Sequence, residues 1–89
     1  MTPVDSQKAF ADKMDAARVA QHLSIRTMGR IAGVPPTTVH GWLNGTHFPS
    51  MVLHANYLKV VETLGLVDQM PDEVREALWI ADQSRLWAG

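Results

Sequence analysis

The chain has 89 residues, of which 46% are apolar, and this is enough for one small hydrophobic core but not for two domains. It contains no cysteine, which excludes disulfides and thiolate metal sites and fits a reducing cytoplasm. Its apolar residues are dispersed, so no run approaches the ~20 residues that cross a bilayer, and the N-terminus lacks a signal-peptide pattern. We therefore expect a single cytoplasmic domain over residues 1–89 without a membrane partner.

The formal net charge of −1 hides an uneven distribution of charge along the chain. Residues 16–61 contain no Asp or Glu, whereas residues 62–89 contain six acidic and two basic residues. The acid-free segment holds all four histidines and the basic residues Arg18, Arg26, Arg30 and Lys59. A polyanion would be attracted to this middle segment and repelled by the acidic ends. Chance clustering in a short chain is the alternative explanation.

The first two predicted helices cover residues 6–21 and 25–32. Asp5 or Ser6 could cap the first helix, whose apolar residues follow helical spacing. These residues are Phe10, Met14, Ala17 and Ala20. Ser24 is the expected cap of the second helix, with Leu23 and Met28 at the positions of a hydrophobic staple, and Gly33 is the expected stop.

Three further helices are predicted in the second half of the chain. Pro36 suits the first turn of a helix over residues 36–43, which ends at Asn44-Gly45. Ser50 could cap a helix that ends at Gly65, with buried positions at Leu53, Tyr57, Val60, Val61 and Leu64. Pro71 and two following acids predict a helix over about residues 71–87. No segment alternates as a strand does, so we expect an all-α domain of about five helices.

The helices over residues 25–32 and 36–43 have the lengths and the short connection of a helix-turn-helix. Gly29 stands in the middle of the first of them, where glycine costs ~1 kcal/mol relative to alanine, so its presence suggests close packing. The inward positions are filled by Met28, Ala32, Val34, Val39 and Trp42. At such a position Trp42 is expected in the core rather than as a stacking residue for a nucleic-acid base.

The run "LSIRTMGRIAGVPPTTVHGWLNGTHFPS", followed by "LKVVETLGL", resembles the Cro/repressor-type (Xre-like) family of helix-turn-helix DNA-binding domains. The resemblance covers residues 5–66, and its specific part is residues 23–50. It implies a compact five-helix bundle of the lambda-repressor-like type in a bacterial or phage-encoded protein. Pro35 departs from the family pattern, because a Ser or Thr that caps the recognition helix is common there.

The resemblance also implies which residues contact double-stranded DNA, with helix 36–43 in the major groove. The base-facing positions carried over from the family are Pro36, Thr37, His40 and Gly41. The implied phosphate contacts are Ser24, Arg26, Arg30, Thr38, Asn44, Thr46 and His47. Since no Arg, Asn or Gln stands on the base-facing side, we expect modest sequence discrimination, assisted by DNA shape or a second subunit.

The C-terminal helix has more apolar surface than one core contact needs. One stripe consists of Val74, Ala77, Leu78 and Ala81, and a neighbouring face carries Trp79, Ile80, Leu86 and Trp87. The second face is predicted to form a homodimer interface or to dock a partner. The alternative is that one face completes the core and that Trp87 has no role near a frayed end of the chain.

Other classes of site receive little support from the sequence. The histidines at positions 22, 40, 47 and 54 contain no i, i+4 pair, so no metal site is expected, and His22 and His54 are expected at the surface or its boundary. The chain has no cysteine nucleophile, no cleft-like grouping of acids and no phosphate-binding glycine loop, so we expect no enzyme, no cofactor and no small-molecule ligand.

The sequence therefore predicts a small transcriptional regulator, a repressor, that binds double-stranded DNA as a homodimer. The alternative is a protein-interaction module on a helix-turn-helix scaffold, which uses its apolar C-terminal helix and belongs to a longer bacterial signalling or defence protein.

Overall fold

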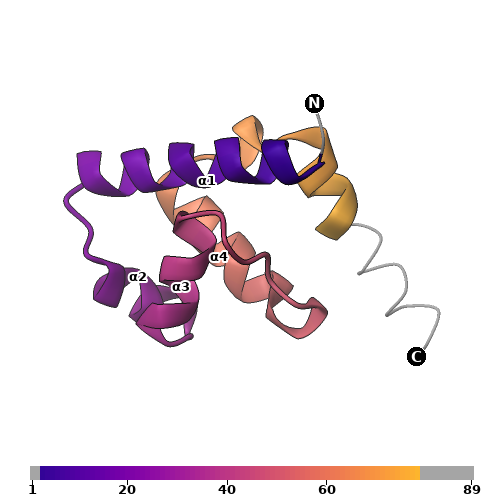
Figure 1. The fold of residues 1–89 in the computed structure, drawn as a ribbon. Helices are drawn as coiled ribbons and strands as arrows, with labels where there is room; N and C mark the ends of the chain where they lie inside the picture. Colours follow the sequence, from indigo (N-terminus) through magenta and orange to yellow (C-terminus); the bar gives the residue numbers. More distant parts are fainter. Residues whose placement is uncertain (1–2, 79–89) are drawn as a thin grey trace.

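The computed structural model describes residues 3–78, and most of them are helical (Figure 1). Four α-helices follow one another: α1 (Pro3–Ala20), α2 (Ile25–Ala32), α3 (Pro36–Leu43) and α4 (His54–Leu64). Two 3₁₀ turns, η1 (Met51–Leu53) and η2 (Val67–Gln69), flank α4, and residues 72–78 are again helical. Residues 3–78 contain no strand, which confirms the predicted all-α class of about five helices. Within the same range, no helix combines the length and the apolar character that crossing a membrane requires.

Helix α1 begins earlier than the sequence analysis expected. It starts at Pro3, where the missing N–H and the fixed φ of proline suit a first turn, so Asp5 and Ser6 lie inside the helix and do not cap it. Ser6 is buried along with Phe10 and Met14, whereas Ala20, expected on the same apolar stripe, is exposed. The helix crosses the whole of one side of the domain (Figure 1).

Helices α2 and α3 have the predicted bounds. The Ser24 hydroxyl caps α2 and accepts a hydrogen bond from the backbone N–H of Thr27 at 3.0 Å. Gly33 takes a left-handed conformation, with φ of 76°, and its N–H donates to the carbonyl oxygen of Gly29 at 2.8 Å. Pro36 opens α3 after only three residues of turn, Gly33 to Pro35. The two helices thus form the helix-turn-helix that the sequence predicts.

Gly29 is the point of closest approach between α2 and the chain that enters α3. A Cβ atom at this position would lie 2.8 Å from the carbonyl oxygen of Val34 and 3.3 Å from the backbone nitrogen of Pro36. Both neighbours are backbone atoms, which cannot rotate away as a side chain could. The close packing expected at this helical glycine is therefore confirmed. The atoms that approach it belong to the turn and to the first residue of α3.

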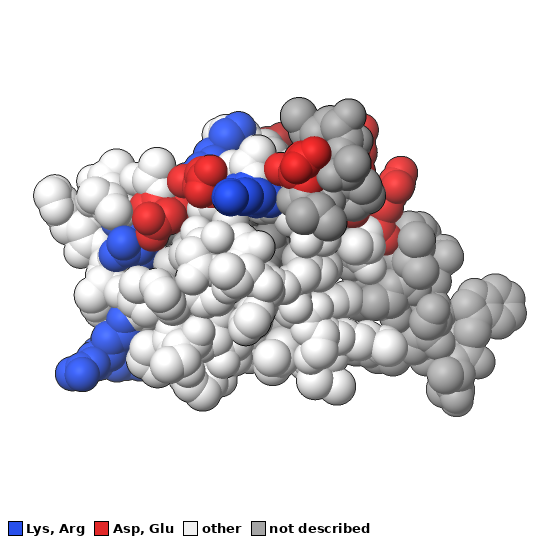
Figure 2. Space-filling view, in the orientation of Figure 1, with Lys and Arg blue, Asp and Glu red and all other residues white. Residues whose placement is uncertain are grey.

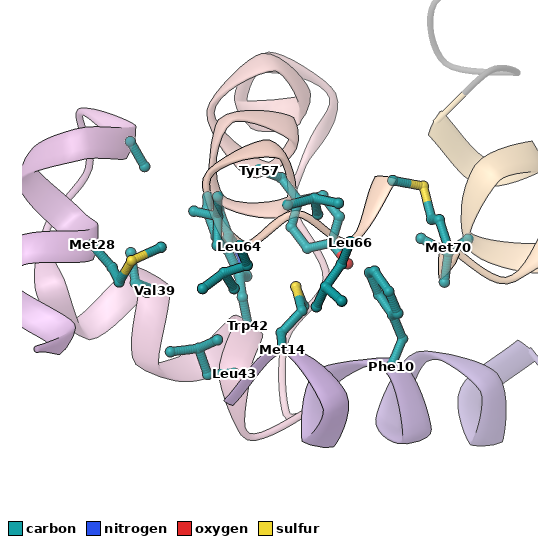
Figure 3. Packing of buried hydrophobic residues seen from close by; sticks show 14 of the residues in the cluster. Phe10, Met14, Met28, Val39, Trp42, Leu43, Tyr57, Leu64, Leu66 and Met70 are labelled. Atoms are coloured by element: carbon teal, nitrogen blue, oxygen red, sulfur yellow. The ribbon is translucent and has the colours of Figure 1, made fainter. Parts of the chain in front are cut away.

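The hydrophobic core joins α1 to the helix-turn-helix and to α4 (Figure 3). Trp42 is buried, and its ring meets that of Tyr57 edge to face, with centroids 5.5 Å apart and planes at 78°. Burial raises the pKa of the Tyr57 hydroxyl well above its ordinary value, because the phenolate would lose its hydration. The expected core position of Trp42 is confirmed.

The start of the α4 region differs from the prediction. Ser50 makes no side-chain cap, and its carbonyl oxygen instead accepts from the N–H of Leu53 at 2.9 Å to form η1. α4 itself begins at His54, which is buried and not at the surface as expected, with its ring 6.2 Å from the ring of Phe48. The predicted end at Gly65 is confirmed, since Gly65 has φ of 74° and the N–H of Leu66 donates to the carbonyl oxygen of Val61 at 3.1 Å.

The helix over residues 72–78, the last that the structure describes, packs near α1. The N–H of Arg75 donates to the carbonyl oxygen of Pro71 at 2.9 Å, as expected for a helix that starts at this proline. Val74 and Leu78 are buried in the cluster that also contains Phe10. This packing places residues 72–78 beside the N-terminal end of α1 (Figure 1).

We expect Gly29→Ala to lower the free energy of unfolding by roughly 1–2 kcal/mol. Alanine favours a helix by ~1 kcal/mol, but its methyl group would overpack against the Val34 carbonyl, which typically costs more. Arg30→Ala, at the next and exposed position of α2, is the control and should change stability by less than ~0.5 kcal/mol. Chemical denaturation measures both variants; a Gly29→Ala variant as stable as the wild type would contradict the close approach.

Candidate nucleic-acid interface

Charge is segregated on the folded domain. Neither α2 nor α3 contains an acidic residue, whereas Asp5, Asp12 and Asp15 all lie on α1. On the face shown in Figure 2, acidic and basic residues are interspersed along α1, and the lower left, where α2 and α3 lie, shows basic and no acidic residues. The three acids of α1 are matched by three basic residues, Lys8, Lys13 and Arg18, so α1 has no net charge. An anionic ligand is favoured at the helix-turn-helix, where basic residues face no acid within α2 or α3.

The N-terminal end of α2 offers an exposed site for an anion. Ser24 is exposed, and its hydroxyl donates to the Thr27 hydroxyl at 2.8 Å while it caps the helix. Arg26 and Arg30 are exposed and four residues apart, so their side chains leave the same face of α2. The positive end of the helix dipole and two guanidinium groups thus lie along one face of a short helix.

Arg18 belongs to a different environment from Arg26 and Arg30. Its Nε atom lies 3.0 Å from Oδ1 of Asp15, and a terminal nitrogen donates to the Leu23 carbonyl oxygen at 2.8 Å. The sequence analysis counted Arg18 within the acid-free segment, but a carboxylate one turn earlier on α1 offsets its charge. The free positive charge of the interface therefore comes from α2.

The N-terminal part of α3 presents most of the predicted base-facing positions to solvent. Pro36, Thr37 and His40 are exposed, while Thr38 is half-buried. The N–H of Thr38 donates to the Pro35 carbonyl oxygen at 3.0 Å, so this amide is already engaged. Pro35 makes no side-chain cap, in line with its departure from the family pattern. What α3 exposes at its start is one hydroxyl and one imidazole.

Gly41 does not have the exposure that a base-facing role requires, and this corrects the sequence analysis. The residue is buried because the ring of His47 lies on it: a Cβ atom at Gly41 would be 2.9 Å from Cδ2 and 3.2 Å from Cγ of His47. His47 itself is exposed. The surface at this position of α3 is therefore an imidazole from the following loop.

His40 lies at the border between the α3 face and the acids of α1. It lines a hollow of about 300 Å³ between the two helices. The other lining residues are Asp12, Asp15, Arg18, Ile25, Leu43 and Asn44. The carboxylates disfavour the approach of a phosphate to His40 from this side.

The loop after α3 is held in place by its own hydrogen bonds and by α1. The Asn44 side-chain oxygen accepts from both the N–H, at 2.9 Å, and the hydroxyl of Thr46. Gly45 takes φ of 76°, and a Cβ atom there would lie 3.3 Å from Cα of Lys8 on α1. The loop residues predicted to contact phosphate, Asn44, Thr46 and His47, are all exposed, but the side-chain oxygen of Asn44 is used internally.

The remaining predicted surface lies beyond the described residues. Trp79, Ile80, Leu86 and Trp87, expected at a dimer or partner interface, fall outside residues 3–78. Among residues 3–78, no three His, Cys, Asp or Glu side chains gather as metal ligands. Comparison with known proteins found no matching family model, no matching curated protein and no matching solved structure.

Proposed function

We propose that this domain binds double-stranded DNA with α3 in the major groove and acts as a small transcriptional regulator. The observation that carries the proposal is the exposed start of α3, which the close contact at Gly29 holds against α2, a helix with two exposed arginines. A helix that reads bases needs a second helix on the phosphate backbone to fix its orientation. Here α2 supplies the second helix.

The proposed phosphate contacts are Ser24, Arg26 and Arg30 on α2, with Thr38 and Thr46 beside α3. Phosphate contacts provide most of the affinity but carry no sequence information. The acids of residues 72–78 lie away from this surface, whereas Asp12 and Asp15 of α1 share a hollow with His40 and disfavour a phosphate there.

The proposed base contacts are few. The Thr37 hydroxyl can bond to a base or its methyl group can meet that of thymine, and His40 can donate to a purine acceptor. Pro36 contributes shape alone. Such a surface supports moderate discrimination, which a second subunit about one helical turn away on the DNA would multiply.

The family resemblance of residues 5–66 favours the same function, and it favours a cytoplasmic repressor that occupies its site as a homodimer. We place the dimer interface on the C-terminal apolar residues Trp79, Ile80, Leu86 and Trp87. A two-fold dimer uses the same patch from both subunits, which suits a single surplus apolar face.

We expect duplex DNA to bind with an affinity that falls steeply as the salt concentration rises. Basic side chains that bind phosphates release the counterions condensed on the DNA, and added salt opposes this release. Arg26→Ala should weaken binding to all sequences about equally and reduce the slope of log K against log salt by about 0.9. Lys13→Ala, which removes one positive charge from the exposed surface of α1, is the matched control and should leave the slope unchanged. Absence of binding even at low salt would refute the proposed function.

Thr37→Ala should change sequence preference rather than general affinity. Loss of one base contact typically costs ~1–3 kcal/mol at the affected base pair and little elsewhere. Selection of bound sequences from a random duplex library, with wild type and variant in parallel, measures this effect. An equal loss over all sequences, like that expected for Arg26→Ala, would assign Thr37 to the phosphate backbone instead.

We expect the full chain to sediment with twice the mass of one chain, and Trp87→Ser to shift the equilibrium to the monomer. The matched control is Val67→Ser, which replaces an exposed apolar residue in η2 and should leave the dimer intact. A wild type that stays monomeric at high concentration while it still binds DNA would remove the dimer from the proposal and keep the DNA contact.

A further inference from the structure

The face of α3 has a gap at Gly41, and a residue from another segment fills it. Gly41 has no side chain, and the ring of His47 occupies the place where one would begin, with Cδ2 and Cγ 2.9 and 3.2 Å from the position of a Cβ atom. We infer that His47 reads a base pair from the face of α3, in place of the side chain that Gly41 lacks. This inference rests on the proposed function and goes beyond it, since the sequence analysis placed His47 on a phosphate.

The loop holds both the backbone and the ring of His47 against α3. The N–H of His47 donates to the carbonyl oxygen of Gly41 at 3.2 Å. Thr46, one residue earlier, is fixed by its two hydrogen bonds to the Asn44 side chain. The imidazole is thus supported by the same helix that carries Thr37 and His40, and a side chain whose anchors are fixed in this way loses little entropy on binding.

One ring nitrogen of His47 is already engaged, and this decides the chemistry of the other. Nδ1 lies 2.8 Å from the carbonyl oxygen of Thr46. A carbonyl oxygen can only accept, so Nδ1 carries the proton and donates it. In the neutral ring, Nε2 is then an acceptor.

An acceptor at Nε2 matches the edge of a base and not the phosphate backbone. Phosphate oxygens offer no proton, so a neutral imidazole in this tautomer makes no hydrogen bond to them. In the major groove, the proton donors are the amino groups of adenine N6 and cytosine N4. The base pair under His47 should therefore carry A or C on the strand nearer to the ring.

Selection from a random duplex library tests this assignment with wild type, His47→Ala and Gly41→Ala. His47→Ala should reduce the preference for A or C at one base-pair position by about fivefold or more and leave other positions unchanged. Gly41→Ala keeps the histidine but forces its ring to move, so it should alter the preference at the same position. Thermal melting of both variants checks that they remain folded.

Arg26→Ala provides the reference for a contact that ignores sequence. If His47→Ala weakens all sequences equally, as Arg26→Ala should, or leaves every preference unchanged, the base-reading role of His47 is wrong while the DNA-binding function stands. If the wild-type protein binds no duplex at low salt, the proposed function itself fails, and this inference fails with it.

Discussion

The absence of a side chain at Gly29 is the constraint on which the rest of the site depends. Any larger residue at this position would bring its Cβ atom to 2.8 Å from the Val34 carbonyl oxygen and 3.3 Å from the Pro36 nitrogen. Glycine therefore lets the turn and the start of α3 lie directly against α2. The left-handed Gly33 turns the chain, and the N–H groups of Gly33 and Val34 both return to the Gly29 carbonyl. The start of α2 and the exposed face of α3 are consequently parts of one rigid unit.

Capping, stop and start residues were sufficient to predict the ends of helices where several of them occur close together in the sequence. Ser24, Gly33 and Pro36 each act within one turn of their own position, so the bounds of α2 and α3 could be predicted to the residue. The predicted starts of α1 and α4 were wrong because residue types that often cap helices were assumed to do so here. Ser6 is instead buried inside α1, and Ser50 leads into a 3₁₀ turn before α4 begins.

The surroundings of the site could not be predicted in the same way, because they depend on contacts between distant segments. Nothing near Gly45 indicates that its backbone packs against Lys8, yet this contact fixes the loop that brings His47 onto Gly41. The pairing of Arg18 with Asp15 has ordinary helical spacing, and it was missed because charge was counted by segment. Thr37 and His40 are exposed, as the base-facing positions carried over from the family resemblance require, whereas Gly41 of the same set is buried.

The acids of residues 72–78 lie at the opposite end of the domain from the arginines on α2, which gives the molecule an electric dipole although its net charge is close to zero. In the electric field of a polyanion, a protein with such a charge distribution and little net charge is mainly rotated and only weakly attracted. It is therefore oriented before contact. For the proposed contact with DNA, such orientation would raise the rate of productive encounter, because fewer collisions would occur in unproductive orientations. The hollow beside His40 contains the carboxylates of Asp12 and Asp15, and it is the border of the surface that attracts an anion.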